Sequence, residues 1–282
     1  MSTIKALRTR IKSVKSTQKI TKAMRMVAAS KLHKAKNAAN FAQQYRDRIF
    51  LLLSIAQKNI DYSELSLFYR SMLTKKEFYK RTIAIVYSSD RGLCGAFNGT
   101  MYKKLKKDLC QYENLKIITI GKKLDNALSK IYNVMAHLEA SLDSAVISSK
   151  VIDLIVKEVE SDHDVRVVVY FTKFKNALVQ TPSLQTIIPV EEQILDEAIN
   201  VNLEFEGNNI VERICDLYLS SNFTANLFEN RASEEASRMT AMDNATRNAG
   251  KMIDQLTLKM NRTRQSQITK ELIEVISGAE AV

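Results

Sequence analysis

Residues 239–260 read MTAMDNATRNAGKMIDQLTLKM. They lie within a long stretch, Asn209–Gly278, that has no proline and, before Gly278, only one glycine, Gly250. Apolar residues recur there at intervals of three, four or seven: Met239, Met242, Ala249, Ile253, Leu256 and Met260. This spacing is typical of a helix with one buried stripe. An unbroken helix of this length reaches roughly 100 Å, deeper than an ordinary globular core, so it needs a partner along its length.

The other end of the chain offers that partner. Residues 2–58 contain no glycine or proline, and a heptad frame fits them throughout. Its seam is apolar at both ends and polar or alanine-rich between: Ile4, Leu7, Ile11, Val14, Gln18, Thr21, Arg25, Ala28, Leu32, Ala35, Ala39, Ala42, Arg46, Ile49, Leu53 and Ala56. Ile20, Met24 and Val27 form a competing stripe. We therefore expect an antiparallel coiled coil of residues 1–60 and 209–282.

The helix lengths also predict a register. If both helices leave the middle of the chain at one level, the numbers of facing residues total about 268, which places Ile4 beside Arg264. Residues after Gln265 then overhang as a single helix over roughly 25 Å. This overhang has an apolar stripe without a partner in its own chain: Ile268, Leu272, Ile273, Val275, Ile276 and Val282.

The middle of the chain has the pattern of an α/β domain. Three β-branched apolar runs, 82–87, 115–120 and 165–171, predict buried strands, and 184–190, with Pro182 and Pro189 nearby, predicts an edge strand. Helices are expected at 96–112, 122–131 and 143–160, the last with Val146, Ile147, Ile152, Leu154 and Ile155 toward the core. The alternation predicts a small, mostly parallel, Rossmann-like α/β domain at residues 80–190.

Few residues suggest chemistry. The turn Ser88–Gly95 follows the first strand, where an α/β fold binds phosphate, but its glycine spacing is not that of a dinucleotide or P-loop motif, so a structural turn is favoured. Three cysteines and three histidines show no metal-ligand spacing. No nucleophile–base grouping can be assembled from so few histidines. We expect no cofactor, no metal and no catalysis.

Charge is concentrated at the start of the chain. There are 42 basic and 31 acidic residues, a net charge of +11, and residues 1–36 hold eleven basic residues and no acid. This segment admits four interpretations: a solvated face, a nucleic-acid-binding basic helix, a transit peptide, or a surface for an acidic protein. The unbroken heptads argue against a transit peptide. The spread of basic residues around the helix argues against reading bases, but a basic coiled-coil nucleic-acid-binding protein stays the alternative.

Three motifs carry a family resemblance. Residues 16–31 (STQKITKAMRMVAASK) and 264–279 (RQSQITKELIEVISGA) resemble the N- and C-terminal signatures of the gamma subunit of F-type ATP synthases, and 90–95 (DRGLCG) resembles its turn after the first strand. They occur in the family's order at both ends and in the middle. The resemblance implies a non-catalytic central rotor shaft, which couples ion-driven rotation of the membrane ring to ATP synthesis or hydrolysis in the catalytic head.

The resemblance also implies partners: the alpha and beta subunits of the head, the epsilon subunit and the c-subunit ring, with no nucleic acid. Lys22, Met24 and Arg25 match the part of the shaft that faces an acidic loop of the beta subunits. A second set matches polar contacts with the head: Arg238, Arg264, Gln265, Thr269 and Glu271. Phe205 and Glu206 fall near the family's foot contact with the c ring.

The sequence also bears on where in the cell the chain is located. No apolar run reaches the ~20 residues of a membrane span, so we expect membrane association only through partners. The absence of a cleavable leader favours a bacterial chain at the cytoplasmic face of the inner membrane over a processed mitochondrial chain. No cysteine-bearing insertion of the chloroplast kind is present, which argues against thiol regulation.

Overall fold

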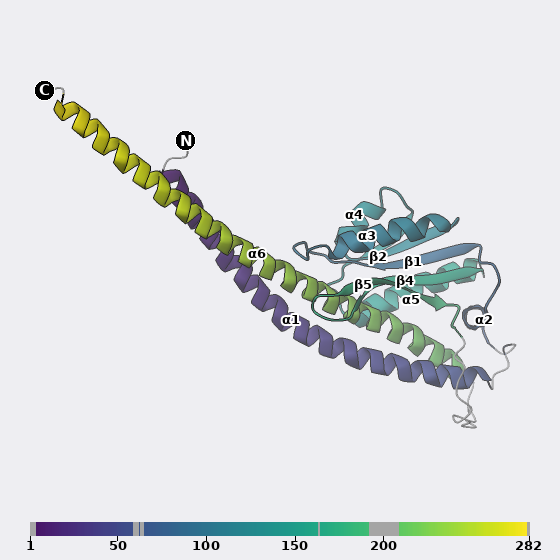
Figure 1. Ribbon diagram of the computed structural model, residues 1–282. Helices are drawn as coiled ribbons and strands as arrows, with labels where there is room; N and C mark the ends of the chain where they lie inside the picture. Colours follow the sequence, from purple (N-terminus) through teal and green to yellow (C-terminus); the bar gives the residue numbers. More distant parts are fainter. Residues whose placement is uncertain (1–3, 59–61, 63–64, 163, 192–208, 281–282) are drawn as a thin grey trace. The chain divides into compact units, whose positions relative to one another are not determined.

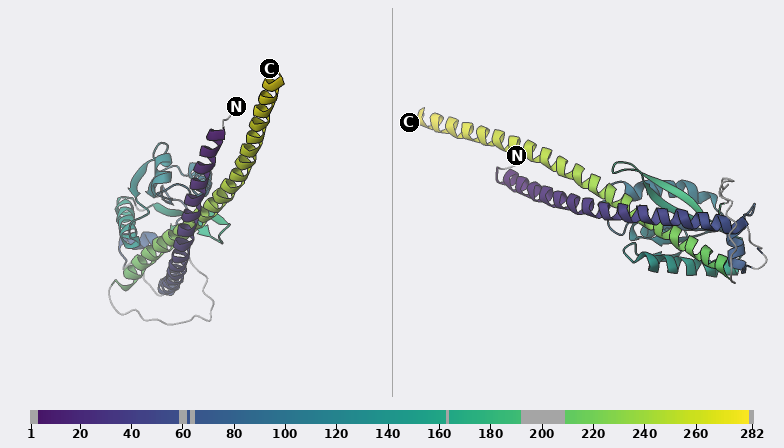
Figure 2. Two further views of the ribbon diagram at one scale, coloured as in Figure 1. Left: turned by 90° about the vertical axis from the view of Figure 1, so that its left-hand side faces the viewer. Right: turned by 90° about the horizontal axis from the view of Figure 1, so that it is seen from below.

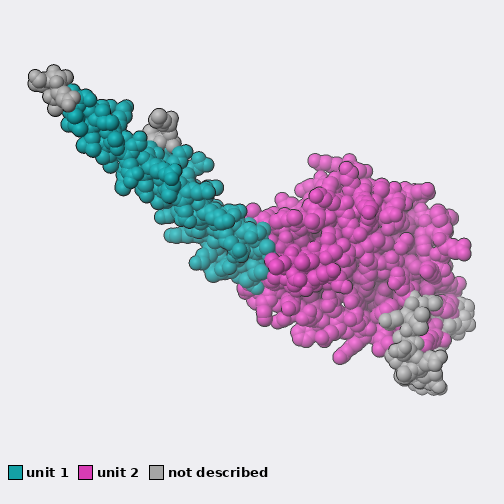
Figure 3. Space-filling model, in the orientation of Figure 1, with its two compact units in different colours: residues 1–29, 238–282 teal, residues 30–237 magenta. Residues whose placement is uncertain are grey.

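The computed structural model describes residues 4–58, 62, 65–162, 164–191 and 209–280. They divide into two compact units (Figure 3). Unit 1 comprises residues 1–29 and 238–282, and unit 2 comprises residues 30–237.

Two long helices, α1 (Ile4–Lys58) and α6 (Ile210–Glu280), each contribute to both units. All of the predicted seam residues of α1 are buried or half-buried, whereas in the competing stripe Ile20 and Val27 are 58% and 55% exposed and only Met24 is half-buried. The heptad frame is therefore confirmed as the one that buries side chains.

Within unit 1 the two helices run antiparallel in the predicted register. Hydrogen bonds link Arg25 with Asp243 and Thr21 with Thr246, pairs whose numbers total 268 and 267. The end of α6 continues past the first turn of α1 (Figures 1 and 2). The predicted overhang is thus present in the structure.

Unit 2 contains a five-stranded sheet in the order β3-β2-β1-β4-β5. Its strands are β1 (Arg81–Tyr87), β2 (Leu115–Ile120), β3 (Val134–Leu138), β4 (Val165–Phe174) and β5 (Gln180–Ile188). The first four are parallel and β5 pairs antiparallel with β4. The mostly parallel sheet confirms the predicted fold class, a coiled coil of terminal helices together with an α/β domain.

Two apolar cores cover the two faces of the sheet. On one face, α3 (Phe97–Asp108), its short continuation η2 (Leu109–Gln111) and α4 (Lys122–Leu128) pack on Ala84, Val86, Val168 and Tyr170. On the other face, α2 (Leu67–Leu73), α5 (Ser144–Ser161) and the unit 2 parts of α1 and α6 bury the larger core. Figure 1 shows this layering, with α3 and α4 across the sheet from α5.

Polar bonds fasten α6 to the sheet within unit 2. The buried Tyr87 hydroxyl at the end of β1 donates to the Phe223 carbonyl at 3.0 Å. The Thr172 amide of β4 donates to Asn230 Oδ1 at 3.2 Å, and Ser233 Oγ donates to the Thr172 carbonyl at 2.8 Å. Because buried polar groups are costly unless bonded, these pairs fix one position of α6 on the sheet.

Two details differ from the sequence-based expectation. The predicted edge strand is at an edge, but it begins at Gln180 and includes Pro182. The sequence analysis missed β3, a five-residue strand at the opposite edge. Its side chains are mostly half-buried, and His137 is exposed, so it lacks the continuous apolar run of a central strand.

Candidate functional site

The turn after β1 was the first candidate for a ligand site. Its Asp90 carboxylate instead accepts from backbone amides at the start of α4 and in the loop after β3. Oδ1 accepts from Lys122 N and Ala140 N, both at 3.2 Å, and Oδ2 accepts from Ser141 N at 2.9 Å. The Asp90 carboxylate therefore occupies the backbone donors that a bound anion would need.

The next amides of α4 are also bonded to the chain itself. Lys123 N donates to the Ser89 carbonyl at 3.0 Å, and Leu124 N donates to Ser88 Oγ at 3.4 Å. Gly121 has a φ of +106°, and a Cβ built there would lie 2.4 Å from the Ser88 carbonyl oxygen. This glycine permits the backbone to approach Ser88 closely. Both observations favour the structural interpretation of the turn.

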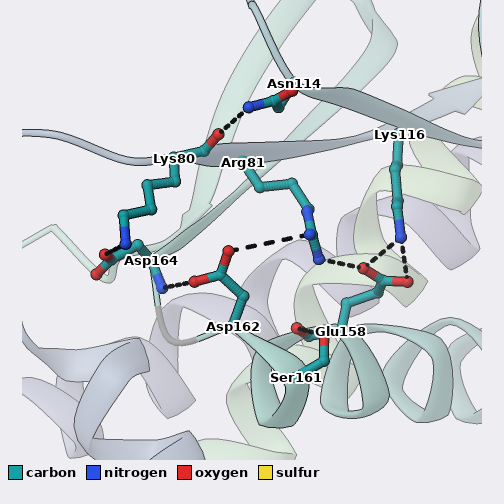
Figure 4. A network of polar contacts seen from close by, with 8 residues as sticks. All are labelled: Lys80, Arg81, Asn114, Lys116, Glu158, Ser161, Asp162 and Asp164. Carbon is teal, nitrogen blue, oxygen red and sulfur yellow. Dashed lines mark hydrogen bonds and ion pairs between the residues drawn. The ribbon is translucent and has the colours of Figure 1, made fainter.

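A second polar cluster lies at the amino ends of β1 and β2 (Figure 4). Glu158 of α5 accepts from Arg81 Nη1 at 2.9 Å and from Lys116 Nζ at 2.7 Å. Asp164 pairs with Lys76 and lies 3.6 Å from Lys80 Nζ. The hydrogen bond from Lys76 is the main reason why the pKa of Asp164 is lowered. Because these carboxylates are paired with cations, the cluster joins β1 and β2 to α5 and provides no free acid or base.

Unit 1 holds the third polar cluster, in the middle of the coiled coil. Gln18 Nε2 donates to the Thr246 carbonyl at 3.5 Å, and the hydroxyls of Thr21 and Thr246 lie 2.8 Å apart. Thr21 is only 9% exposed. A polar layer inside a coiled coil favours one register, because a shifted helix would leave these groups unpaired.

One turn away, a carboxylate bridges two arginines. Arg25 Nη1 of α1 donates to Asp243 Oδ1 at 3.0 Å, and Arg247 Nη2 of α6 bonds to Oδ2. The pKa of Asp243 is lowered, chiefly by the hydrogen bond from Arg247 and less by Arg25, so it stays ionised at neutral pH. The sequence analysis did not single out Asp243 or Arg247. The signal was available, because the predicted register places Arg25 opposite residue 243.

The other predicted site residues fall into two groups. Lys22 is exposed beside the half-buried Met24 on α1, and Arg238 is half-buried on α6. The second group lies on the exposed last turns of α6: Arg264, Gln265, Thr269 and Glu271. Phe205 and Glu206 lie outside the described residues. The structure therefore brings Lys22, Met24 and Arg25 together on one segment, and the four residues of the α6 end on another.

The end of α6 has an exposed apolar surface. From Arg264 to Ser277 every residue is exposed, and the predicted stripe comprises Ile268 (49%), Leu272 (57%), Ile273 (58%), Val275 (69%) and Ile276 (57%). A lone helix of this kind is marginal in water, and a contiguous apolar patch marks an interaction surface. These five side chains are exposed, as the register predicts, and Val282, the last residue of the predicted stripe, lies outside the described residues.

The described residues include no helix with the length and hydropathy of a membrane span. They contain no group of three or more histidine, cysteine, aspartate or glutamate side chains that would hold a metal ion. Unit 1 has instead a basic hollow of about 620 Å³, lined by Arg8, Ile11, Lys12, Lys15, Ser16, Lys19, Thr257 and Met260.

Comparison with known proteins supplies an independent test. A family model described as ATP synthase matches residues 3–282. The ATP synthase gamma chain of Rickettsia akari is 42% identical over 297 residues, and that of Rickettsia prowazekii is 41% identical over 296 residues. Both alignments cover 100% of this chain and 100% of the relative.

Solved structures give the same fold. A chain of the Euglena gracilis mitochondrial ATP synthase, in an assembly of OSCP, F1 and c-ring, matches with a TM-score of 0.69 at 18% identity, covering 99% of this chain and 94% of that one. A chain of the Tetrahymena thermophila central stalk and c-ring matches with a TM-score of 0.55 at 21% identity, covering 80% and 99%. The match to the family model and the identity to the Rickettsia gamma chains favour the gamma-subunit resemblance over a nucleic-acid-binding coiled coil.

Proposed function

The chain belongs to the gamma family of the ATP synthase, and on this premise we propose how its two helical ends work as the rotor shaft of that complex. A gamma chain is the central rotor that couples ion-driven rotation of the membrane ring to ATP synthesis or hydrolysis in the head of alpha and beta subunits. Residues 1–60 and 209–282 serve as the shaft, and residues 80–190 form the α/β domain.

The observation that carries the proposal is the surface of unit 1. It contains fifteen basic and five acidic residues, a net charge of +10, while twenty-seven basic and twenty-six acidic residues leave unit 2 at +1. A strongly basic surface favours an acidic partner and speeds the encounter with it. Lys22, Met24 and Arg25 are therefore proposed to face acidic segments of the beta subunits.

The exposed end of α6 supplies the second contact with the head. Its apolar stripe is proposed to turn inside the head as a mainly apolar bearing, with polar contacts from Arg238, Arg264, Gln265, Thr269 and Glu271. The surrounding subunits would remove from water the apolar area that the chain leaves exposed. Because the shaft profile differs around its axis, each orientation favours a different conformation of each catalytic subunit.

The remaining partners are proposed from the family resemblance. The epsilon subunit and the c ring hold the other end of the rotor, with Phe205 and Glu206 at the foot contact. The chain is part of a membrane-bound complex, and we place it peripherally at the cytoplasmic face of the bacterial inner membrane. We propose that its role in the complex is non-catalytic, as the family resemblance implies.

Rotation of the reconstituted complex tests the proposal. The full-length chain is assembled with alpha and beta subunits fixed to a surface, and a bead attached to unit 2 is followed during ATP hydrolysis. Stepwise rotation supports the rotor. A bead that stays still while the head hydrolyses ATP at its full rate would contradict it.

Hydrogen exchange tests the bearing separately. Residues 266–277 should exchange rapidly in the free chain and become protected in the complex, while β1 should be protected in both. Equal protection of residues 266–277 in both states would mean that the chain covers its own stripe. A chain truncated after Gln265 should also aggregate less than the full-length chain.

A further inference from the structure

The bridge between Arg25, Asp243 and Arg247 leaves most of its guanidinium N–H donors unused. Each guanidinium carries five N–H donors, and each uses one of them on Asp243 in the observed bonds. The side chains of Arg25 and Arg247 are 42% and 72% exposed, whereas that of Asp243 is 23% exposed. The two arginines therefore present free donors to solvent while their shared carboxylate is largely covered.

Asp243 also limits how far the two cations can move. Without it, two like charges on neighbouring helices would repel, and each long side chain would sample many rotamers. One carboxylate that bonds both arginines orders them before any partner arrives, which lowers the entropy lost on binding. The bridge keeps a net charge of +1.

The surroundings identify the chemistry of the partner. Residues 1–29 contain eight basic residues and no acid, and Lys22 is exposed three residues before Arg25. A carboxylate that approaches this surface meets an excess of positive charge, and a planar guanidinium binds a carboxylate through two parallel hydrogen bonds. An acidic polypeptide segment fits these donors.

We propose that Asp243 is a positioning residue that holds Arg25 and Arg247 as a paired guanidinium site for a carboxylate-bearing segment of the surrounding head. This inference rests on the proposed rotor function, and it adds Asp243 and Arg247 to the surface that the family resemblance suggests. It also gives Arg25 two roles, since the same side chain joins the helices and contacts the partner.

Binding of the full-length chain to the alpha and beta head tests the proposal. Arg25→Gln and Arg247→Gln should each weaken binding at low salt by about two- to fivefold, the range of an exposed ion pair. Lys251→Gln is the matched control, because it removes the same charge from an exposed residue one turn further along α6. It should weaken binding less than Arg247→Gln does.

Asp243→Asn separates positioning from net charge. This variant makes unit 1 more positive, so long-range attraction alone would tighten binding to an acidic head. Loss of positioning predicts weaker binding instead, and Asp243→Glu should restore it. Helicity of each free variant is measured by circular dichroism to show that the coiled coil is intact.

The possible results distinguish a failure of the proposed rotor function from a failure of the paired guanidinium site. Failure of the wild-type chain to bind or rotate in the head contradicts the proposed function itself. If the wild-type chain binds and rotates normally but Arg247→Gln weakens binding no more than Lys251→Gln does, the paired site is overturned. This result holds even if Asp243→Asn disturbs the fold. Tighter binding by a folded Asp243→Asn would also overturn it.

Discussion

Unit 2 buries a continuous apolar core on both faces of its sheet, whereas unit 1 buries a narrow seam between two helices. Many large side chains of unit 2 are 0% exposed, among them Ile83, Ile118, Val169, Leu219 and Phe223. In unit 1 the buried side chains are fewer and smaller: Leu7, Ile11, Thr21, Ala28, Met242 and Ala249. The coiled coil of unit 1 is thin because alanine and threonine in its seam let the two helices approach closely.

The difference shows that the two units depend on different interactions. Unit 2 gains stability from apolar area removed from water. Unit 1 has little such area, and its net charge of +10 means that its like-charged side chains repel one another. Polar pairs across the seam therefore fix its register. Because its two helices bury only a narrow seam against each other, most of their surface stays available to the subunits proposed to surround it.

Gly121→Ala should give a large loss of stability, and only in unit 2. The new Cβ would lie 2.4 Å from the Ser88 carbonyl oxygen, at a φ of +106° that side chains disfavour. Strain and crowding together should lower the free energy of unfolding by about 2–5 kcal/mol. Urea unfolding followed by tyrosine fluorescence measures this. Gly99→Ala, with nothing within 4 Å of the new Cβ, is the control and should not destabilise.

Leucine-to-alanine substitutions compare the two cores directly. Leu219 of unit 2 is 0% exposed and Leu7 of unit 1 is 4% exposed. Leu219→Ala should cost about 2–5 kcal/mol because its rigid surroundings leave a cavity. Leu7→Ala should cost less, since the thin seam beside solvent can close over the gap. Equal losses in urea unfolding would show that the coiled coil packs as rigidly as the sheet.

Acid should weaken both units through their paired aspartates. The pKa of Asp164 is lowered chiefly by Lys76, and that of Asp243 chiefly by Arg247. An aspartate whose pKa is lower in the folded state than in the unfolded state, where it is about 3.9, stabilises the fold above that unfolded value. This stabilisation is lost as the pH falls through the folded pKa. Thermal midpoints measured from pH 6 to about pH 3 should therefore fall less steeply at the acidic end for Asp164→Asn than for the wild type. An unchanged slope would mean that the Lys76 pair does not form in solution.

Much of this fold can be predicted from periodicity because the controlling interactions are local and repetitive. The α1 seam, the three central strands and the register of the coiled coil follow from spacing and helix length alone. β3 could not be predicted, since a half-buried edge strand has no continuous apolar signature. Val146 is expected toward the core but is 43% exposed, while Val151 and Val159 are fully or almost fully buried, because the α5 face is set by its packing on the sheet.

The candidate site is less predictable for a physical reason. Lys22 and Arg25 stand out as cations in an acid-free segment, yet the role of Arg25 depends on Asp243, which is 218 residues away in sequence. Only the register joins them. Contacts with other subunits depend on surfaces that this chain does not contain, so the roles assigned to Arg264, Gln265, Thr269 and Glu271 stay predictions.

Gly250→Ala should have the smallest effect, and in the opposite direction to Gly121→Ala. Gly250 lies inside α6, where glycine costs roughly 0.5–1 kcal/mol relative to alanine. The new Cβ would meet Gln18 Nε2 at 3.2 Å, the far end of a flexible side chain whose bond to the Thr246 carbonyl is already 3.5 Å long. Gln18 can shift by a few tenths of an ångström, so most of the gain in helix propensity should remain. The thermal midpoint of the free chain, followed by circular dichroism, should rise slightly. A fall comparable to that of Gly121→Ala would mean that the seam of unit 1 tolerates displacement as poorly as the sheet, and the contrast between the two units would not hold.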